Sequence, residues 1–301
     1  MFFSQKYLFD SEASKTFDFN NKQLQYNQIN WTSSLSDSDY SKIQDLSLYF
    51  NENNLGNSCV ELVKDLEKFQ ILRVLDLNLA QNKISDQSFI DICTSIFKIQ
   101  SLKKVYLAFW ENSITDDGIK KSIQFIVQSK NLEGFCLYLG KNQIKDAGLQ
   151  IISENIIHLK NIKDLQLSLW GNGLTDIAFR TFSENLSSFP NIIHLYLDFL
   201  YHQNVTDKTA TLLGKSLANL KYLRALQINF QDTGITKEGE QNLANLISQI
   251  SQIVCLRYYY SQKNVSFKDF LVSEKKTLKF FKKRSRYLIF AEVNSIKKLI
   301  N

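Results

Sequence analysis

The chain has 301 residues, enough for one large domain or two of ordinary size. With 44% hydrophobic and 22% charged residues it has the composition of a globular protein, and its single proline, Pro190, argues against a long low-complexity linker. The net charge of +6 is uneven: from Lys263 onward eleven Lys/Arg face three Asp/Glu, a balance of +8 that leaves −2 for the first 262 residues.

The N-terminus lacks the basic stretch and apolar run that are typical of a secretory signal. No apolar run approaches the ~18–20 residues of a membrane span. In a chain without an export signal, cysteines outside CxxC pairs are expected to be reduced. We therefore expect an intracellular protein in the cytoplasm, with the nucleus as an alternative. The cysteines are Cys59, Cys93, Cys136 and Cys255.

Residues 1–42 lack the repeat described below. They carry a few large apolar residues among polar ones, namely Phe17, Phe19, Leu24, Ile29 and Trp31. The end of a repeat stack exposes its core unless another segment covers it. We therefore predict that residues 1–42 form an N-terminal cap.

From Ile43 the chain repeats itself with a period of 29 to 31 residues. Counting the first residue of each copy as offset 0, apolar residues stand at 0, +3, +5, +7 and +12, Asn at +10 and Asp at +14 in the clearest copies. Alternation between +3 and +7 indicates a half-buried strand. The copies start at Ile43, Leu72, Leu102, Leu132, Ile162, Ile192 (with one inserted residue), Leu223 and Ile253.

The second half of each copy has helical periodicity. In the second copy, Phe89, Ile92, Cys93 and Ile96 recur at the spacing of one helix face. The Asp at +14 stands where a helix N-cap would satisfy free backbone amides, and glycine often follows two residues later. Each copy therefore predicts a strand, a turn and a helix.

These repeats resemble the leucine-rich-repeat family, and its ribonuclease-inhibitor-like branch in particular. The family signature L-x-x-L-x-L-x-x-N/C-x-L recurs here with one additional "Lx" step, so that Asn falls at +10. We interpret this step as a strand that is two residues longer. The resemblance implies an α/β leucine-rich-repeat solenoid, a horseshoe arc with parallel strands on the concave face and helices on the convex face. Eight such repeats would occupy residues 43–267.

The asparagines at +10 are predicted to form a structural ladder. Their side-chain amides can bond the backbone groups that strands leave unpaired at the turn. The residues are Asn82, Asn112, Asn142 and Asn172.

If +3, +5 and +7 point inward, then +4, +6 and +8 point outward from the concave sheet. Large aromatic residues at these offsets in the middle repeats predict a site for a protein or peptide partner. Trp110 and Trp170 would stand ~10 Å apart, with Gly140 leaving a gap between them. The alternative is that the residues at +8 pack against the turn. The predicted partner-binding residues are Tyr106, Trp110, Tyr138, Trp170, Tyr196 and Leu200.

Residues 268–301 alternate apolar and basic residues. They predict an amphipathic C-terminal cap or tail. The alternatives are that its basic cluster serves nuclear import, contacts an acidic surface or contacts nucleic acid. The cluster is Lys282, Lys283, Arg284 and Arg286.

Motifs for catalysis are missing from the sequence. "TLLGKS" at 211–216 resembles the end of a phosphate loop, but Thr209 replaces the first glycine. His158, His194 and His202 lack metal-ligand spacing, and an open arc offers no closed pocket for a small molecule. We predict no catalytic residue, metal or cofactor, and a non-catalytic protein-interaction scaffold. The alternatives are a GTPase activator similar to the Ran GTPase-activating proteins, or a nucleic-acid-associated protein that acts through its tail.

Overall fold

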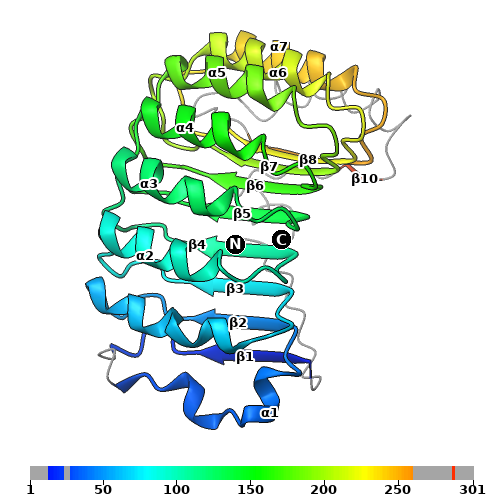
Figure 1. Ribbon diagram of the computed structural model, residues 1–301. Coiled ribbons are helices and arrows are strands. Elements are labelled where there is room, and N and C mark those ends of the chain that lie inside the picture. The colour runs from blue at the N-terminus through cyan, green and yellow to red at the C-terminus, as the bar shows by residue number, and fades with distance from the viewer. Residues whose placement is uncertain (1–12, 24–27, 260–286, 289–301) are drawn as a thin grey trace, which may run out of the picture.

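The computed structural model describes residues 13–23, 28–259 and 287–288. In them, ten strands form one sheet in the order β1 to β10, and every strand is parallel to its neighbour (Figure 1). The strands are β1 Ser14–Asp18, β2 Asp45–Tyr49, β3 Val74–Asn78, β4 Lys104–Ala108, β5 Gly134–Tyr138, β6 Asp164–Ser168, β7 His194–Asp198, β8 Ala225–Asn229, β9 Cys255–Tyr259 and β10 Tyr287–Leu288.

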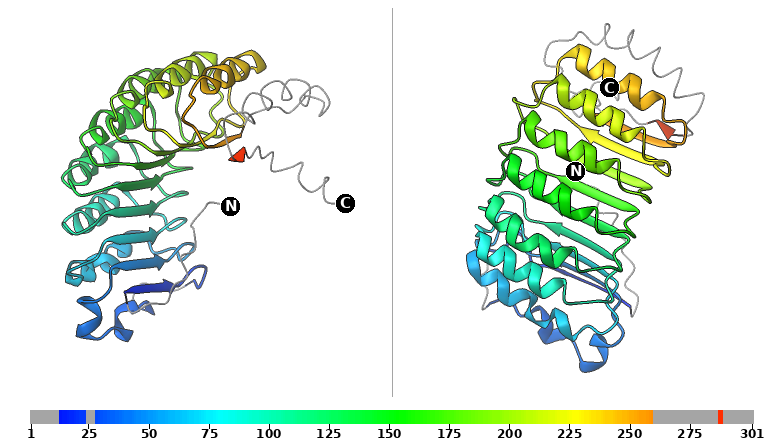
Figure 2. Two further views of the ribbon diagram at one scale, coloured as in Figure 1. Left: turned by 90° about the vertical axis from the view of Figure 1, so that its right-hand side faces the viewer. Right: turned by 45° about the horizontal axis from the view of Figure 1, so that its top comes forward.

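From β1 to β9, helices connect consecutive strands and cover one face of the sheet. The strands line the inside of an arc and the helices its outside (Figure 2). The predicted fold class is therefore confirmed: the chain is an α/β solenoid of strand–helix units with a parallel sheet on its concave face. The helices are α1 Asp37–Tyr40, α2 Asp86–Ile96, α3 Asp116–Ile126, α4 Asp146–Ile156, α5 Asp176–Leu186, α6 Asp207–Leu217 and α7 Lys237–Ser248, with 3-10 helices η2 Trp31–Ser34 and η3 Gly56–Lys68.

The core lies between the sheet and the helices. Side chains at +3, +5 and +7 point into it, as Leu75, Leu77 and Leu79 show with no exposed surface. Because the strands pair in register, equivalent side chains stack from repeat to repeat, and each buried Leu contributes about 1.5–3 kcal/mol. The stack thus gives every repeat the core that a single unit could not form.

Backbone pairing continues two residues beyond the assigned strands. The amide of Gln81 donates to the Trp110 carbonyl (2.9 Å), and the amide of Glu111 donates to that of Gly140 (2.8 Å). This is the longer strand that the extra "Lx" step predicted. The chain then turns at offset +9 with positive φ, for example 55° at Gln81, 54° at Glu111 and 65° at Tyr201.

The predicted role of the Asp at +14 as helix N-cap is wrong. The N-cap is the preceding residue, for example Thr115, whose hydroxyl accepts from the Asp117 amide (3.2 Å). The Asp is the first helical residue and bonds the next repeat instead. Asp86 accepts from the Thr115 amide (2.7 Å) and hydroxyl (2.6 Å), which joins consecutive helix N-termini.

Glycine in the first helical turn makes room for this bond. A Cβ on Gly118 would lie 2.3 Å from Oδ1 of Asp86, and one on Gly148 would lie 2.4 Å from Oδ1 of Asp116. Both distances are shorter than non-bonded atoms allow. The glycine two residues after the Asp therefore accommodates the carboxylate of the previous repeat.

The N-terminal segment extends the sheet by one strand. β1 pairs with β2 in the register of the repeats, and Phe19 stacks on Phe50 with ring centroids 5.6 Å apart. Trp31 is buried, stacks against Phe69 at 6.1 Å and donates its indole N–H to the Leu62 carbonyl (3.0 Å). The segment thus covers the apolar side of the first repeat.

The first copy differs from the others in having a 3-10 helix, η3, in place of an α-helix. Its N-terminus lacks a side-chain cap bond, and Gly56 follows with φ +54°. Apart from β10, which pairs with β9, the predicted tail of residues 268–301 lies outside the described residues. Among the described residues, no helix is long and apolar enough to cross a membrane.

Candidate functional site

The candidate site is the concave face, which the outward side chains of the strands form. The register aligns offset +4 across the sheet, so Tyr106, Cys136, Gln166 and Tyr196 are successive neighbours. Offset +6 aligns in the same way and places Tyr138 between Ala108 and Ser168. The predicted outward positions therefore align across the sheet, although Cys136, Ser168 and Asp198 at these positions are buried.

Three tyrosines mark the middle of this face. Tyr106, Tyr138 and Tyr196 stand on β4, β5 and β7, and all three are half-buried. The rings of Tyr138 and Tyr196 meet edge to face, with centroids 6.5 Å apart. Edge-to-face contact is a favourable arrangement of two aromatic rings.

Hydrogen bonds between side chains hold the polar ends of this face. Tyr138 donates to Gln166 Oε1 (2.5 Å), and Tyr49 donates to Asp76 Oδ2 (2.8 Å). Ser168 donates to the buried Asp198 (2.9 Å). Burial raises the pKa of Tyr138 and of Tyr49, so both hydroxyls keep the proton that they donate.

The concave face is acidic in balance. Among the outward side chains of β1 to β9, five carboxylates stand against two basic side chains, Lys104 and Arg257. Burial raises the pKa of Asp76 and of Asp198 above the ordinary Asp value. The concave side of the sheet therefore combines aromatic rings with carboxyl groups. The acidic residues are Asp18, Asp45, Asp76, Asp164 and Asp198.

Trp170, at the carboxyl end of its strand, does not border a gap. A Cβ on Gly140 would lie 1.9 Å from Trp170 Nε1, so the indole fills the space above the glycine, and the predicted gap is wrong. The Lys141 ammonium lies 5.1 Å from the centroid of the indole, and the Tyr201 ring meets it at 6.3 Å. Trp170 is therefore both half-buried and part of a surface cluster.

Polar residues continue this cluster along the strand ends. Glu111 accepts from Gln81 (2.7 Å) and from Lys141 (2.6 Å), which links three consecutive repeats. Bonds from Lys141 and Gln81, opposed by burial, hold the pKa of Glu111 below its ordinary value. Trp110 and Leu200, the other two residues predicted at +8, are half-buried in the same row.

The predicted asparagines bond the turn backbone between repeats. Asn112 donates to the carbonyls of Leu79 (3.1 Å) and Phe109 (2.9 Å), and its Oδ1 accepts from the amide of Ile84 (2.9 Å). Asn82, Asn142 and Asn172 repeat this pattern. Their side chains thus join the turn backbones of consecutive repeats.

Sequence reasoning missed two further members of the ladder. Asn53 precedes it and donates to the Phe50 carbonyl (2.9 Å). His202, at +10 of the copy with the insertion, is buried and places Nε2 2.9 Å from the Leu169 carbonyl oxygen. Burial lowers the pKa of His202, so the neutral ring donates from Nε2. The position of His202 at offset +10 was the signal that could have identified it as a member of the ladder.

Other candidate chemistry does not assemble in the described part of the chain. There, no three His, Cys, Asp or Glu side chains gather as metal ligands. The described cysteines are free thiols. The predicted basic cluster, Lys282, Lys283, Arg284 and Arg286, lies outside the described residues.

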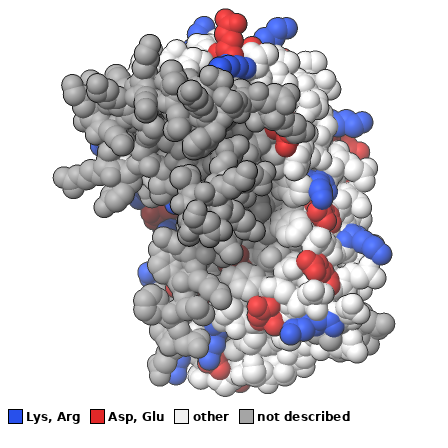
Figure 3. Space-filling model, turned by 180° about the vertical axis from the view of Figure 1, so that it is seen from behind, with Lys and Arg blue, Asp and Glu red and all other residues white. Residues whose placement is uncertain are grey.

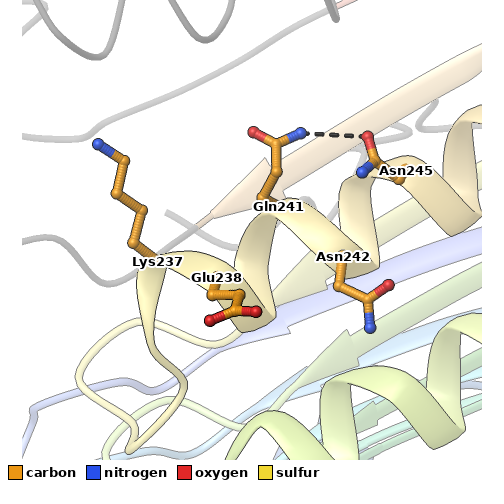
Figure 4. Close-up of a pocket in the computed structure, with 5 residues that line it drawn as sticks. All are labelled: Lys237, Glu238, Gln241, Asn242 and Asn245. Carbon is orange, nitrogen blue, oxygen red and sulfur yellow. Dashed lines mark hydrogen bonds between the residues drawn. The ribbon is translucent and has the colours of Figure 1, made fainter.

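The described surface also has a hollow on α7 and an edge of mixed charge (Figure 3). Lys237, Glu238, Gln241, Asn242 and Asn245 line a hollow on α7, where Gln241 donates to Asn245 (3.1 Å) (Figure 4). All five side chains are polar and come from one helix, unlike the apolar walls of a ligand pocket. Figure 3 shows basic and acidic side chains interspersed along one edge of the molecule.

Comparison with known proteins names no family for this chain. No family model matches the sequence, and no curated protein matches it. Among solved structures, the crystal structure of a protein from Bacteroides fragilis resembles the chain with a TM-score of 0.44 and 14% identity. That likeness covers 84% of this chain and 76% of the other.

Proposed function

We propose that this chain is a leucine-rich-repeat protein of the ribonuclease-inhibitor-like type. We propose further that it is a non-catalytic scaffold that binds a protein or peptide partner on its concave aromatic surface. The observation that carries the proposal is the cluster of Tyr106, Tyr138 and Tyr196 on strands β4, β5 and β7 of a stacked parallel sheet. We expect the scaffold to act inside the cell.

The rigidity of the sheet supports a binding role. Backbone pairing, the asparagine ladder and the Asp bonds between helices fix the spacing of successive strands. A partner therefore does not have to order the surface that it binds, and preorganisation lowers the entropy cost of association. An extended concave face also suits a protein or peptide better than a small metabolite.

The aromatic side chains support the same role. Tyr and Trp dominate the energetics of interfaces because they bury large areas with few rotatable bonds. Tyr138 and Tyr196 already contact each other, so truncation of both should remove one continuous anchor.

A variant pair tests this proposal. The full chain is used as bait in extracts of native cells, and captured proteins are identified by mass spectrometry. We expect a partner that wild type captures to lose at least about 2 kcal/mol, or roughly 30-fold in Kd, with Tyr138→Ala and Tyr196→Ala combined. Tyr222→Ala, which removes an exposed tyrosine at a turn before β8, is the matched control.

Purified variant and captured partner then give the Kd by titration, and thermal unfolding shows that the variant is folded. If the double variant retains every captured protein at wild-type affinity, the concave face is not the binding surface. Loss with Tyr222→Ala alone would move the site to the turns.

A further inference from the structure

A second surface stands out by its charge. It consists of the turns that lead into β2 to β9, from four residues before offset 0 to two after, and we name it the strand-start rim. It carries eleven Lys/Arg against four Asp/Glu, and all eleven are exposed. They are Lys42, Lys68, Arg73, Lys98, Lys103, Lys104, Lys130, Lys160, Lys163, Lys221 and Arg224.

The rim is one continuous strip and not a set of separate turns. The amide of Lys103 donates to the Arg73 carbonyl (2.7 Å), and the amide of Lys163 donates to that of Glu133 (2.8 Å). Asn161 donates its side chain across to the Lys130 carbonyl (2.8 Å). At about 4.8 Å per strand, eight turns span about 34 Å.

Most of these cations have no carboxylate partner in the described structure. Glu133 forms ion pairs with Lys103 (3.9 Å) and Lys163 (2.9 Å), and Lys68 forms one with Asp65 (2.6 Å). The other eight form no ion pair with any residue that the structure describes. Charge balance within the protein therefore does not account for them.

Helix dipoles account for only part of the charge. The six helices α2 to α7 end at this rim, and each C-terminus carries about half a negative charge. Their sum, about −3, offsets less than half of the excess of basic side chains. In the seven copies whose turns the structure describes, the opposite rim, at offsets +9 to +15 and their equivalents after the insertion, holds ten Asp/Glu against five Lys/Arg. Charge is thus segregated to two rims in a body that is slightly acidic as a whole.

We propose that the strand-start rim binds an acidic segment of a partner protein. Lys and Arg that are exposed, unpaired and held on a rigid edge attract carboxylates and raise association rates. The inference goes beyond the concave site, because it rests on basic side chains of the turns, of which Lys104 alone also belongs to the concave face.

A protein segment fits this rim better than a nucleic acid does. Nucleic acid carries a charge every ~1.7 Å of duplex, and the rim borders the acidic concave face, where Asp45 and Asp164 begin their strands. Phosphates that extend past the rim would meet these carboxylates. Among Phe, Tyr and Trp on the described rim, Tyr222 alone is more than half exposed, so the surface offers few large rings for stacked bases.

The test uses the full chain with Lys282, Lys283, Arg284 and Arg286 changed to Gln, which reduces binding by the basic tail. A fluorescein-labelled oligoglutamate peptide is the probe, and anisotropy at about 50 mM salt reports its Kd. The rim variant carries Lys98→Glu, Lys130→Glu and Lys160→Glu. The matched control carries Lys83→Glu, Lys120→Glu and Lys208→Glu, which are exposed and lie outside the rim.

We expect the rim variant to lose at least about tenfold in affinity and the control less than about threefold, because both have the same net charge. The proposal would be overturned if the rim variant and the control lost the same affinity, or if the rim variant bound the peptide unchanged. It would also be overturned if the chain with an unaltered rim did not bind the peptide. The choice of a protein segment would be overturned if a single-stranded oligonucleotide bound more tightly than the peptide and the rim variant no longer bound it. Circular dichroism checks folding, and Lys→Gln at the same positions replaces any variant that unfolds.

Discussion

The bonds between helix N-termini predict graded losses of stability, because the number of bonds that each Asp accepts differs among repeats. Asp116 accepts one bond, from the Lys145 amide (2.8 Å). Asp146 accepts two, from the amide (2.7 Å) and the hydroxyl (2.6 Å) of Thr175. Asp176 accepts three, two from Thr206 and one from Thr209 (2.7 Å). Substitution of each Asp by Ala should therefore destabilise the chain in that order.

The magnitudes follow from the count. A hydrogen bond to a charged group contributes about 1.5 kcal/mol at the low end of its range, which applies because these groups are partly solvated. We expect losses of about 1.5 kcal/mol for Asp116→Ala, about 3 for Asp146→Ala and about 4.5 for Asp176→Ala. All three residues start a helix, so the dipole contribution of about 0.5 kcal/mol is common to them and cancels in the differences.

Urea unfolding followed by circular dichroism measures these losses, with a check that the m-value is unchanged. Asp117→Ala is the control, because Asp117 lies in the same first turn and its carboxylate bonds no described residue. Equal losses for Asp116, Asp146 and Asp176 would refute the reasoning, since a common helix-dipole effect would then suffice. A loss for Asp117→Ala as large as for Asp116→Ala would do the same.

Two further predictions concern single positions. Gly118→Ala should destabilise the chain although Ala is the better helix former by about 1 kcal/mol, because the new Cβ would lie 2.3 Å from Asp86 Oδ1. In an Asp86→Ala background the same change should become neutral or stabilising in urea unfolding; an unchanged penalty would contradict this steric account. His202→Asn should gain stability relative to wild type as pH falls below about 6.5, because burial lowers the pKa of His202 and the unfolded chain then binds the proton first. Thermal unfolding between about pH 7.5 and 5.5 measures this gain, with His158→Asn, at an exposed position, as the control; parallel pH profiles for wild type and His202→Asn would refute it.

Much of the fold could be predicted because one face of every strand is buried. A slip of one residue would turn Leu75, Leu77 and Leu79 to solvent, so apolar alternation fixes both the register and the direction of the side chains. The period of about 30 residues then placed each strand beside the next. Strand β1 was not predicted because Lys15 occupies the position equivalent to +3, although Phe17 and Phe19 match +5 and +7.

The sequence pattern could not predict features that depend on a shift of one residue or on the rotamer of one side chain. Spacing alone cannot separate an N-cap from the first helical residue, although Thr115, Thr175 and Thr206 directly before the Asp were a usable signal. Nor could alternation show that the Trp170 indole lies over Gly140, because that depends on side-chain torsions at the end of the strand. His202 was hidden by the inserted residue that follows it.

Some offsets hold the same kind of residue in every repeat, whereas others vary from repeat to repeat. Offsets +3, +5 and +7 repeat similar residues because each meets the same core, and +10 and +14 do so because each serves the same turn. Offsets +4 and +6 have an equally constant place in the sheet, yet they hold residues as different as Tyr106, Cys136 and Gln166. The helices that the structure describes cover the other face of the sheet, so packing against them does not set this variety (Figure 2). We therefore interpret the tyrosine cluster on β4, β5 and β7 as part of the proposed partner site on the concave face.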